Sequence, residues 1–438
     1  MGKVVKLEPK AAGKAEAKRR ARSLAARGVG RPASVDRRNR PRPDKTALVL
    51  GGGGFTGGVY EIGALRALDL LTVNSNVNNF DVYVGTSAGA FIASLCANGV
   101  TPEEMMRVVT RQGTTPFKDI DLGDLLQPNI KEFVRKGVLL PLRALALTRQ
   151  VISQWGASSL MDVVLGLAEG LPSGAYTGAG IESYMREVLG EPGRTDDFRQ
   201  LECELYITAT DLDTCERVVF GVEGSDAVPI STAVRASGAL PMVYAPVRVE
   251  ERELIDGGIV STTNLDIAVE AGARFVVVIN PIVPFVNDFS TTVRTLRGTR
   301  QRRVSDMGFP QIGYQAFKLV AHQRLHELAK GWQQRYPGVD IVLIEPEPTD
   351  ELMFQTSMMN FASRVEIARH GFESVTQHLA GEYEHYEEIT KRHGIEISRK
   401  RVRKVIERLG AEDEHVSAWR KILEGTTGAL LRQAGAAS

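Results

Sequence analysis

The alternation of apolar and polar stretches over residues 46–97 predicts two consecutive strand-turn-helix units. The apolar runs Thr46–Leu50 and Phe80–Val84 have the length and β-branched content of strands. A glycine-bearing turn follows each strand, and apolar residues at helical spacing follow each turn: Tyr60, Ala64, Leu68 and Leu71 in the first unit, Phe91 and Leu95 in the second. The carboxyl ends of parallel strands lie at one edge of a sheet, so the two turns can meet over one site.

Further predicted strands and helices follow along the chain, and together with the two strand-turn-helix units they indicate the α/β class. The run Phe275–Asn280 is almost continuously apolar, as expected of a strand buried in a parallel sheet. Polar and basic residues between Asn287 and Met307 predict an exposed loop. Other predicted strands are Leu205–Thr210, Arg217–Phe220 and Val339–Ile344, and predicted helices are Thr101–Gln112, Gln311–Trp332 and Met358–Leu379.

The second turn, Gly85-Thr86-Ser87-Ala88-Gly89, has the Gly-x-Ser-x-Gly pattern of a nucleophile elbow. Such a turn is too sharp for bulky flanking side chains, and Gly85 and Gly89 remove that collision. It would leave the Ser87 hydroxyl at the N-terminus of the next helix, where the helix dipole favours negative charge. Ser87 is therefore the predicted nucleophile, and an ordinary helix cap is the alternative interpretation of so short a motif.

The first turn, Gly51 to Gly58, can supply backbone N–H groups to the oxyanion that forms when a serine attacks an ester. Consecutive glycines let the backbone come close and aim its amides at one point. We expect an oxyanion hole from Gly52, Gly53, Gly54 and Gly57, in which Gly53 and Gly54 donate and the other two shape the loop. The rival interpretation is a dinucleotide-binding loop. It needs an acidic residue about 20 positions later, where residues 74–79 contain none.

Asp256 is the predicted base that takes the proton of the serine. It ends the short apolar strand Glu253–Ile255 and precedes Gly257 and Gly258, so its carboxylate would project from a strand end toward Ser87. Asp-Gly alone is an ordinary turn signal. Asp256 is a candidate base because it occurs together with the glycine loop and the serine elbow. An α/β-hydrolase triad with a late histidine stays open but unsupported, because no histidine of the chain occupies a turn after a predicted strand. The seven histidines are His322, His326, His370, His378, His385, His393 and His415.

The glycine loop, the serine elbow and the triplet Asp256-Gly257-Gly258 resemble, in this order, the three motifs of the patatin-like phospholipase family. Two further segments are similar to that family, Ile207–Thr214 and Arg235–Pro241. The resemblance covers residues 45–280 and extends weakly to about residue 381. It implies a three-layer α/β/α fold with a central, mostly parallel sheet. It also implies a Ser87–Asp256 dyad that cleaves acyl ester bonds of lipids, as a phospholipase or triacylglycerol lipase.

Two departures from the family pattern bear on the substrate. The family usually carries Arg or Lys before the last glycine of its first motif, where this chain has Thr56, so a phosphate headgroup loses a partner. After Gly258 the segment Ile259–Asp266 is longer than the family's short Asn-x-Pro and lacks its proline. Acyl ester hydrolysis is therefore better supported than phospholipid preference. A catalytically silent lipid-binding or scaffolding module of the same fold is the alternative that Thr56 favours.

Charge divides the chain into a basic arm and an acidic remainder. Residues 1–44 hold fourteen Lys or Arg against four Asp or Glu, a net charge of +10, which leaves −9 for the rest of a chain of net charge +1. The arm has too few apolar residues to pack a core and is expected to be disordered, either as a solvated tail or in peripheral contact with an anionic membrane. Nucleic acid is not expected as a partner, because the arm has no aromatic residue.

The cysteines and the N-terminus indicate a cytoplasmic location. Cys96, Cys203 and Cys215 are an odd, scattered set that fits a reducing compartment and has neither disulfide nor zinc-site spacing. No apolar run follows the N-terminal basic residues, so no secretory signal is visible. We expect no cofactor and no metal.

Three regions are expected: the arm 1–44, the hydrolase domain 45–381 and a charged helical extension 382–438. Residues 117–174 form an insert within the domain. Its apolar stretch Val138–Leu147 is too short for a membrane span, and it is either a helix packed on the core or an interfacial lid over the site. The basic residues near Arg401 in the extension are either a solvated face or a partner surface.

Overall fold

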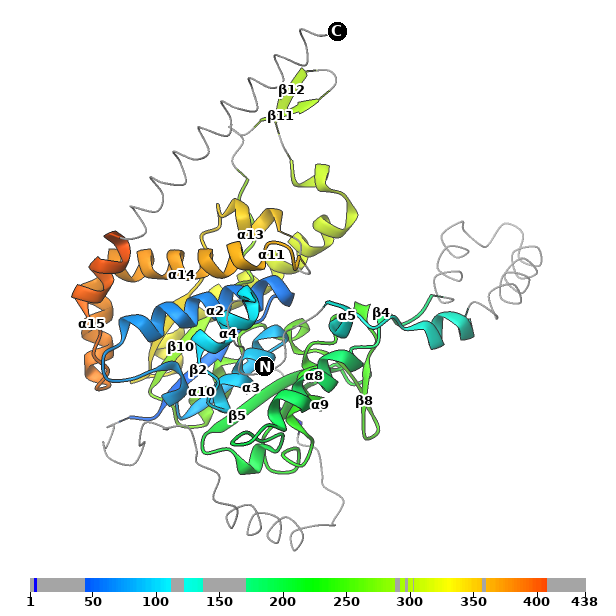
Figure 1. Cartoon of the computed structure of the whole chain (residues 1–438), viewed down its shortest axis with the longest axis horizontal. Coiled ribbons are helices and arrows are strands. Elements are labelled where there is room, and N and C mark those ends of the chain that lie inside the picture. Colours follow the sequence, from blue (N-terminus) through cyan, green and yellow to red (C-terminus); the bar gives the residue numbers. More distant parts are fainter. Residues whose placement is uncertain are drawn as a thin grey trace, which may run out of the picture.

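The predicted apolar strands form the centre of one large sheet (Figure 1). The computed structural model describes residues 4–5, 44–111, 122–136, 171–287, 292–295, 298–301, 303–356 and 360–407. Within this part of the chain the sheet has nine strands, of which seven follow the order β1-β6-β5-β3-β2-β10-β13. Their bounds are β1 Val4–Val5, β6 Arg217–Phe220, β5 Glu204–Asp211, β3 Val82–Thr86, β2 Thr46–Leu50, β10 Phe275–Ile279 and β13 Asp340–Ile344.

The strands β3, β2, β10 and β13 are parallel neighbours. The last residues of β2, β10 and β13 are in register, and Leu50 lies opposite Gly85, the last residue but one of β3, so their carboxyl ends share one edge of the sheet. The residues of β2, β3 and β10 are all buried, as expected of parallel strands covered on both faces. The turns that follow β2 and β3 therefore lie side by side, as the sequence predicts.

The strand β5 has two different neighbours along the same edge. It pairs in parallel with β3 up to Thr86 opposite Thr208. From Ala209 onward it pairs antiparallel with β9 (Arg252–Asp256), beginning with Ala209 opposite Asp256. Because β6 occupies the other edge of β5, β3 and β9 approach each other end to end, and their last residues meet.

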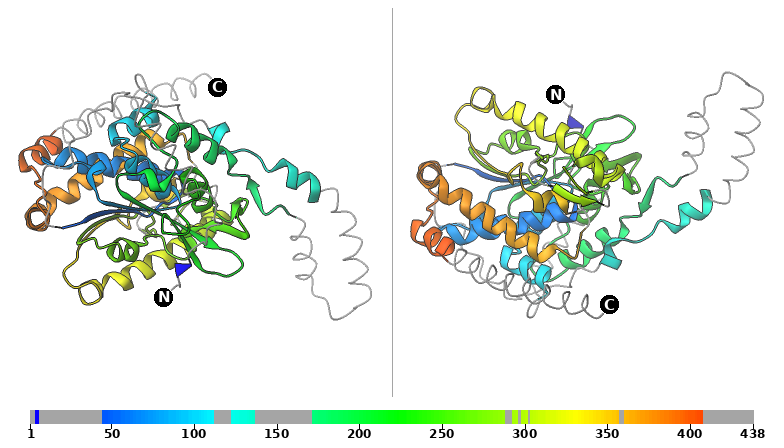
Figure 2. Two further views of the ribbon diagram at one scale, coloured as in Figure 1. Left: turned by 90° about the horizontal axis from the view of Figure 1, so that it is seen from below. Right: turned by 90° about the horizontal axis from the view of Figure 1, so that it is seen from above.

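Helices cover both faces of the sheet, which gives the predicted α/β/α layers (Figure 2). The helices α2 (Gly54–Leu71), α3 (Ala88–Ala97) and α14 (Arg364–Gly381) pack on the face to which Leu48 and Leu50 point. The helices α10 (Leu265–Glu270) and α11 (Phe309–Ala329) pack on the face to which Ala47 and Val49 point. Successive side chains of a strand point to opposite faces, so alternate residues of the strands belong to two separate hydrophobic clusters.

The remaining elements surround this centre. The helix α4 (Pro102–Thr110) begins at Thr101, whose hydroxyl accepts a hydrogen bond from the Glu104 N–H in a capping box. Outside the main sheet, β4 pairs with β7, while β8 extends the sheet beyond β9. Further bounds are α5 Leu122–Leu125, β4 Gly174–Tyr176, α8 Ala179–Leu189, α9 Ile230–Ser237, β7 Met242–Tyr244, β8 Val247–Val249, α12 Trp332–Arg335, α13 Glu351–Gln355 and α15 Tyr383–Arg392, with short 3-10 turns at Val77–Asn79, Phe198–Gln200, Gly257–Ile259 and Val304–Met307.

The structure departs from several sequence expectations. The region predicted as a loop contains an antiparallel hairpin of β11 (Thr292–Thr295) and β12 (Gly298–Gln301). The arm contributes β1, which pairs with β6. Except for Asp44, the rest of the arm lies outside the described residues, as does the apolar stretch of the insert. Among the described helices, none has the length and hydropathy that crossing a bilayer requires.

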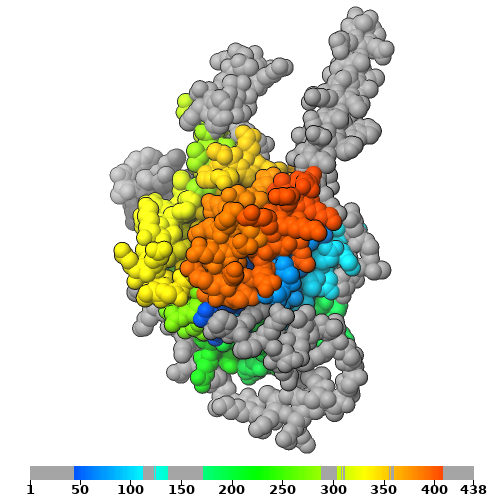
Figure 3. All heavy atoms as spheres, turned by 90° about the vertical axis from the view of Figure 1, so that its left-hand side faces the viewer, coloured from blue at the N-terminus to red at the C-terminus, as the bar shows by residue number. Residues whose placement is uncertain are grey.

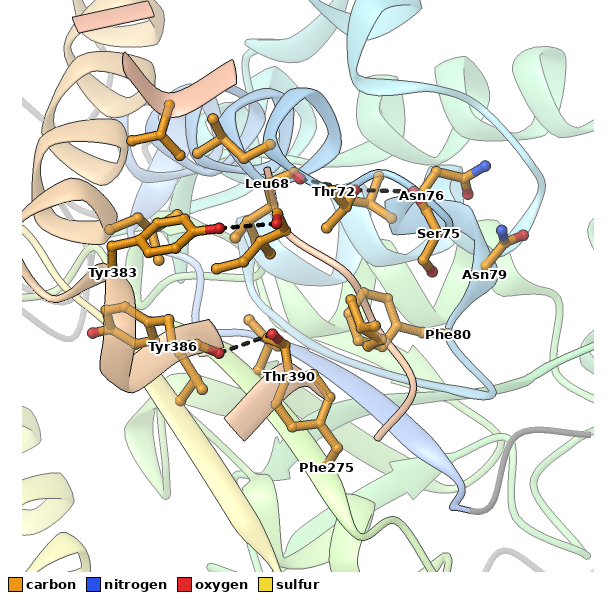
Figure 4. Close-up of a pocket in the computed structure, with 18 residues that line it drawn as sticks. Leu68, Thr72, Ser75, Asn76, Asn79, Phe80, Phe275, Tyr383, Tyr386 and Thr390 are labelled. Atoms are coloured by element: carbon orange, nitrogen blue, oxygen red, sulfur yellow. Dashed lines mark hydrogen bonds between the residues drawn. The ribbon is translucent and has the colours of Figure 1, made fainter. Parts of the chain in front are cut away.

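The first part of the segment expected as an extension packs into the main core. Tyr383, Tyr386 and Ile389 on α15 are buried in the same hydrophobic cluster as the α2 side chains. Tyr383 and Tyr386 line an apolar cavity of about 70 Å³ beside Phe275, at the amino ends of the parallel strands (Figure 4). Figure 3 shows α14 and α15, in orange, as one continuous surface. Residues up to 407 thus share the core of the domain, and residues 408–438 lie outside the described part.

The contact between α2 and α14 depends on two glycines. A Cβ added at Gly63 would lie 2.1 Å from the Ala368 carbonyl oxygen, and one added at Gly371 would lie 2.4 Å from the Tyr60 carbonyl oxygen. Both obstacles are backbone atoms of the opposite helix, which cannot move aside as a flexible side chain can. The two helices are therefore in backbone contact at this crossing.

We predict that Gly63→Ala lowers the free energy of unfolding by about 1–3 kcal/mol, because the added methyl group forces the helices apart. The matched control is Gly313→Ala within α11, where an added Cβ meets nothing within 4 Å. The control should raise the free energy of unfolding by about 0.5–1 kcal/mol through helix propensity alone. Urea unfolding of both variants measures the difference, and equal effects would contradict the backbone contact.

Candidate active site

The backbone at Ser87 has the conformation of a sharp strand-to-helix turn. Its φ is 56° and its ψ is −127°, an unusual state for a residue with a side chain. A Cβ added at Gly85 would lie 2.5 Å from the Ala90 Cα, and one added at Gly89 would lie 2.4 Å from the Leu50 carbonyl oxygen. The two glycines therefore allow β3, the turn and α3 to fold closely against β2.

The hydroxyl of Ser87 is hydrogen-bonded to the carboxylate of Asp256. The Ser87 Oγ donates to the Asp256 Oδ2 at 2.6 Å, and the Gly258 N–H donates to the Asp256 Oδ1 at 2.7 Å. Asp256 is 3% exposed. A Cβ added at Gly257 would lie 2.4 Å from the Thr208 carbonyl oxygen, so the turn after Asp256 can press against β5 only with glycine there. Both carboxylate oxygens are thus held, and one faces the predicted nucleophile.

Burial raises the pKa of the Asp256 carboxyl group to about 6, although the hydrogen bonds from Ser87 and Gly258 act in the opposite direction. At neutral pH the ionised form still predominates. Its higher proton affinity makes it a stronger base than an ordinary aspartate.

The glycine loop follows β2 with three consecutive residues at positive φ. The values are 82° at Gly52, 111° at Gly53 and 67° at Gly54, a path that side chains would obstruct. The Gly52 N–H donates to the Glu61 Oε1 at 2.9 Å, and the Gly57 N–H donates to the Gly53 carbonyl at 3.1 Å. Within the described part of the chain, the N–H groups of Gly53 and Gly54 have no hydrogen-bond acceptor. The loop therefore presents two unused donors, and its other glycines are engaged in its own structure.

Glu61 holds the glycine loop through a hydrogen bond, a role that the sequence does not predict. It lies on α2, is 0% exposed and holds the Gly52 N–H. Burial raises the pKa of this carboxyl group well above its usual range, against the effect of hydrogen bonds from Gly52 and Gly51. Its Oε2 has no hydrogen-bond partner among the described residues. The only signal in the sequence is an acidic residue within the apolar stretch Val59–Ile62.

A buried polar network lies beneath the elbow. The Asn264 Nδ2 donates to the Thr86 Oγ1 at 2.9 Å and to the Thr208 Oγ1 at 3.1 Å. The Arg217 guanidinium donates to the Asn264 Oδ1 at 2.9 Å and forms an ion pair with Asp266 at 2.8 Å. The network joins the residue before Ser87 to the segment after Asp256. Asn264 and Asp266 belong to the longer loop that the sequence marks as a departure from the family pattern.

The end of α9 also holds the elbow, because the Ser87 N–H donates to the Ser237 Oγ at 2.8 Å. Ser237 belongs to the segment Arg235–Pro241, which resembles the family. On β5, the Thr210 Oγ1 donates to the Asp256 carbonyl at 3.0 Å. Hydrogen bonds from neighbouring elements therefore hold both members of the pair.

Ser87 and Asp256 open into a cavity of about 140 Å³ with mainly apolar walls. Gly53, Gly54 and Ala88 line it next to Ser87. Its walls include Phe55, Val59, Ile62, Phe91, Ile92, Val109, Leu125, Ile181, Val234, Leu240, Tyr244, Ile282, Tyr314 and Phe317. A small polar centre inside an apolar pocket suits a substrate with an ester or amide group and a hydrocarbon part.

Among the described histidines, none is hydrogen-bonded to Ser87 or Asp256. His370 is hydrogen-bonded to Asp350, and His393 bridges Asp44 and Asp340. His415 lies outside the described residues. The geometry therefore joins the predicted serine to the predicted aspartate.

A family model for patatin-like phospholipases matches residues 48–269. The chain belongs to the patatin-like phospholipase family. The matched segment contains the glycine loop, the elbow and the Asp256 turn.

Individual relatives are distant. The chain is 21% identical over 231 residues to a protein named probable lipid hydrolase 463L of Invertebrate iridescent virus 6, which covers 53% of this chain and 65% of the viral protein. The chain thus spans less than two thirds of that relative. Among solved structures, VipD of Legionella pneumophila is 17% identical with a TM-score of 0.35, over 77% of this chain and 67% of VipD. ExoU of Pseudomonas aeruginosa is 15% identical with a TM-score of 0.33, over 78% of this chain and 54% of ExoU.

We predict that Glu61→Ala lowers the free energy of unfolding by about 2–4 kcal/mol, because it leaves a cavity and an unpaired Gly52 N–H. Glu61→Gln keeps the acceptor oxygen and the shape, so its effect should stay within about 1 kcal/mol. Thermal and urea unfolding measure both changes. A larger loss for Gln than for Ala would show that the loop depends on the charge of Glu61 and would contradict this account.

Proposed function

We propose that the protein is a serine lipid acyl hydrolase that works through a Ser87–Asp256 dyad. The observation that supports the proposal best is the 2.6 Å hydrogen bond from the Ser87 hydroxyl to a buried carboxylate in an apolar cavity. A serine needs a base within hydrogen-bond reach, and Asp256 is in that position. The family of the chain and the name of its viral relative, a probable lipid hydrolase, support the same reaction class.

In the proposed reaction the Ser87 Oγ attacks the carbonyl carbon of an acyl ester, and its proton passes to Asp256. The oxyanion accepts hydrogen bonds from the N–H groups of Gly53 and Gly54, which have no other acceptor among the described residues. When the tetrahedral intermediate collapses, the alcohol leaves with the proton from Asp256. Asp256 then takes a proton from a water molecule, whose oxygen adds to the acyl carbon. The bond from that carbon to the Ser87 Oγ breaks, the Oγ regains the proton from Asp256, and the carboxylic acid leaves.

The cavity supports an acyl chain as the recognised part of the substrate. Its walls are mainly apolar, so they gain free energy by burying hydrocarbon. Thr56 is buried and carries no charge, so at this position the loop offers no cation to a phosphate headgroup. The proposal is therefore acyl ester hydrolysis without a stated headgroup. Contact of the basic arm with an anionic membrane and a cytoplasmic location stay predictions, because almost all of the arm lies outside the described residues.

A silent lipid-binding module of the same fold is the second candidate, and Thr56 is the observation that favours it. Such a module needs the cavity but no activated serine. Hydrolysis assays separate the two functions.

We predict that Ser87→Ala and Asp256→Asn each lower kcat/KM for a chromogenic acyl ester by about 10³-fold or more, because each removes one half of the dyad. The matched controls are Ser305→Ala and Asp213→Asn, which change the same residue types at exposed positions. Circular dichroism should show an intact fold in all four variants. Activity that survives in either dyad variant would contradict the mechanism, and an inactive wild type would favour the silent module.

The pH dependence provides a separate prediction. Asp256 accepts a proton only as a carboxylate, so kcat/KM should rise about tenfold per pH unit below pH 6 and level off above about pH 7. This midpoint follows from the pKa of Asp256, which burial raises to about 6. The rate profile of the wild type on a substrate without titratable groups measures it. A midpoint near 4 would contradict a buried aspartate as the base.

A further inference from the structure

Two histidines and a glutamate converge at the carboxyl edge of the sheet, away from the dyad. His322 and His326 lie one turn apart on α11, and Glu345 follows directly after the last residue of β13. The His326 Nε2 lies 2.8 Å from the Glu345 Oε2, and the His322 Nδ1 lies 3.8 Å from the Glu345 Oε1. One ligand atom from each residue lies within 4.8 Å of the other two.

We propose that His322, His326 and Glu345 bind a divalent cation of the zinc type. Two imidazole nitrogens and one carboxylate oxygen suit Zn²⁺ and similar transition metals better than Mg²⁺ or Ca²⁺, which prefer oxygen ligands. Three protein ligands leave a fourth position of a tetrahedral ion for water.

The distances fit such an ion after small side-chain movements. Bonds of about 2.0–2.1 Å in a tetrahedral site place neighbouring ligand atoms about 3.3 Å apart. The separations of 2.8 Å between His326 Nε2 and Glu345 Oε2 and of 3.8 Å between His322 Nδ1 and Glu345 Oε1 lie on either side of that value. Rotation of the imidazole rings and of the carboxylate, which now bring one ligand atom of each residue within 4.8 Å of the other two, would bring all three residues to bonding distance.

The surroundings of the site support a ligand role. The Asn280 Nδ2 donates to the Glu345 Oε1 at 2.6 Å and so orients the carboxylate, as outer groups around metal ligands do. The His322 Nδ1 is buried and has no hydrogen-bond partner among the described residues. The contact between His326 and Glu345 satisfies one histidine, whereas the Nδ1 of the other is left 3.8 Å from the carboxylate without a hydrogen bond.

Access from solvent is compatible with ion uptake. The side chains of His322, His326 and Glu345 are 24%, 42% and 14% exposed. The ion could therefore enter without unfolding. Part of its environment would still exclude water.

A bound ion would connect α11 to the end of β13. The same helix contributes Tyr314 and Phe317 to the wall of the active-site cavity. Asn280, which holds Glu345, lies beside the glycine loop, since a Cβ added at Gly51 would be 3.1 Å from its Oδ1. The proposed ion would therefore hold the cavity wall against the end of β13, and it takes no part in the acyl transfer.

The sequence does not predict this site, because Glu345 is 19 residues beyond His326 and has no metal motif around it. The spacing of four between the histidines occurs on any solvated helix face. Only the return of the chain through β13 brings the glutamate to them.

The test is calorimetric titration of ZnCl₂ into the full chain, freed of metal by EDTA and carrying no affinity tag. Wild type should bind one equivalent, and His322→Ala should lower the affinity by about 10-fold or more. His385→Ala on α15 is the matched control, because His385 is exposed and outside the site. MgCl₂ should neither bind measurably nor displace Zn²⁺.

Thermal unfolding of the same proteins gives a second readout. Added Zn²⁺ should raise the Tm of wild type and of His385→Ala but not that of a His322→Ala/His326→Ala double variant. Without metal, His322→Ala should unfold near the wild-type Tm, because its Nδ1 has no hydrogen bond to lose. Equal zinc affinity of wild type and His322→Ala, or an unchanged wild-type Tm, would overturn the proposal. Neither measurement depends on Ser87 or on hydrolysis.

Discussion

The end-to-end approach of β3 and β9 along one edge of β5 is the constraint on which the site depends. The pairing of Thr86 with Thr208 and of Asp256 with Ala209 places the two strand ends one residue apart on their shared neighbour. Ser87 follows the first end, and Asp256 is the second. Because strand register changes in whole residues and each step reverses the side chains, a slip of either strand would remove the 2.6 Å contact. The sheet itself thus sets the geometry of the hydrogen-bonded Ser87–Asp256 pair.

The approach of the two strand ends requires a buried carboxyl group and a strained backbone, and hydrogen bonds from neighbouring residues offset their cost in free energy. Asp256 is a buried carboxyl group with a raised pKa, and Ser87 has a positive φ. The hydrogen bond of the Gly258 N–H to Asp256 and the network of Asn264 and Arg217 hold both residues in place. Strained backbone and shifted pKa values occur together at functional sites, where the neighbouring structure determines the positions of the groups. Glu61 on α2 is likewise a buried carboxyl group with a raised pKa, and it accepts a hydrogen bond from the Gly52 N–H in the glycine loop.

Local sequence signals predicted the parts of the fold that local chemistry determines. The bounds of β2 and β6 match the apolar runs, and the glycine-bearing turns lie where the pattern places them. The antiparallel direction of β9 was not predicted, because a short apolar strand carries no information about its partner. Glu61 and Asn264 were missed for a related reason, since their roles arise from contacts with distant segments. The many charged residues after residue 381 led to the prediction of a separate extension, whereas Tyr383, Tyr386 and Ile389 in this region are buried in the core.

Labelling by a fluorophosphonate, followed by peptide mass spectrometry, tests the pairing of Ser87 with Asp256 most directly. The reagent reacts only with an activated serine, so its rate reports whether the carboxylate removes the proton of that hydroxyl. The account predicts one adduct, on Ser87, formed at least about 100-fold more slowly when Asp256 is replaced by Asn. An adduct on another residue, or an unchanged rate on Ser87 without the carboxylate, would contradict it.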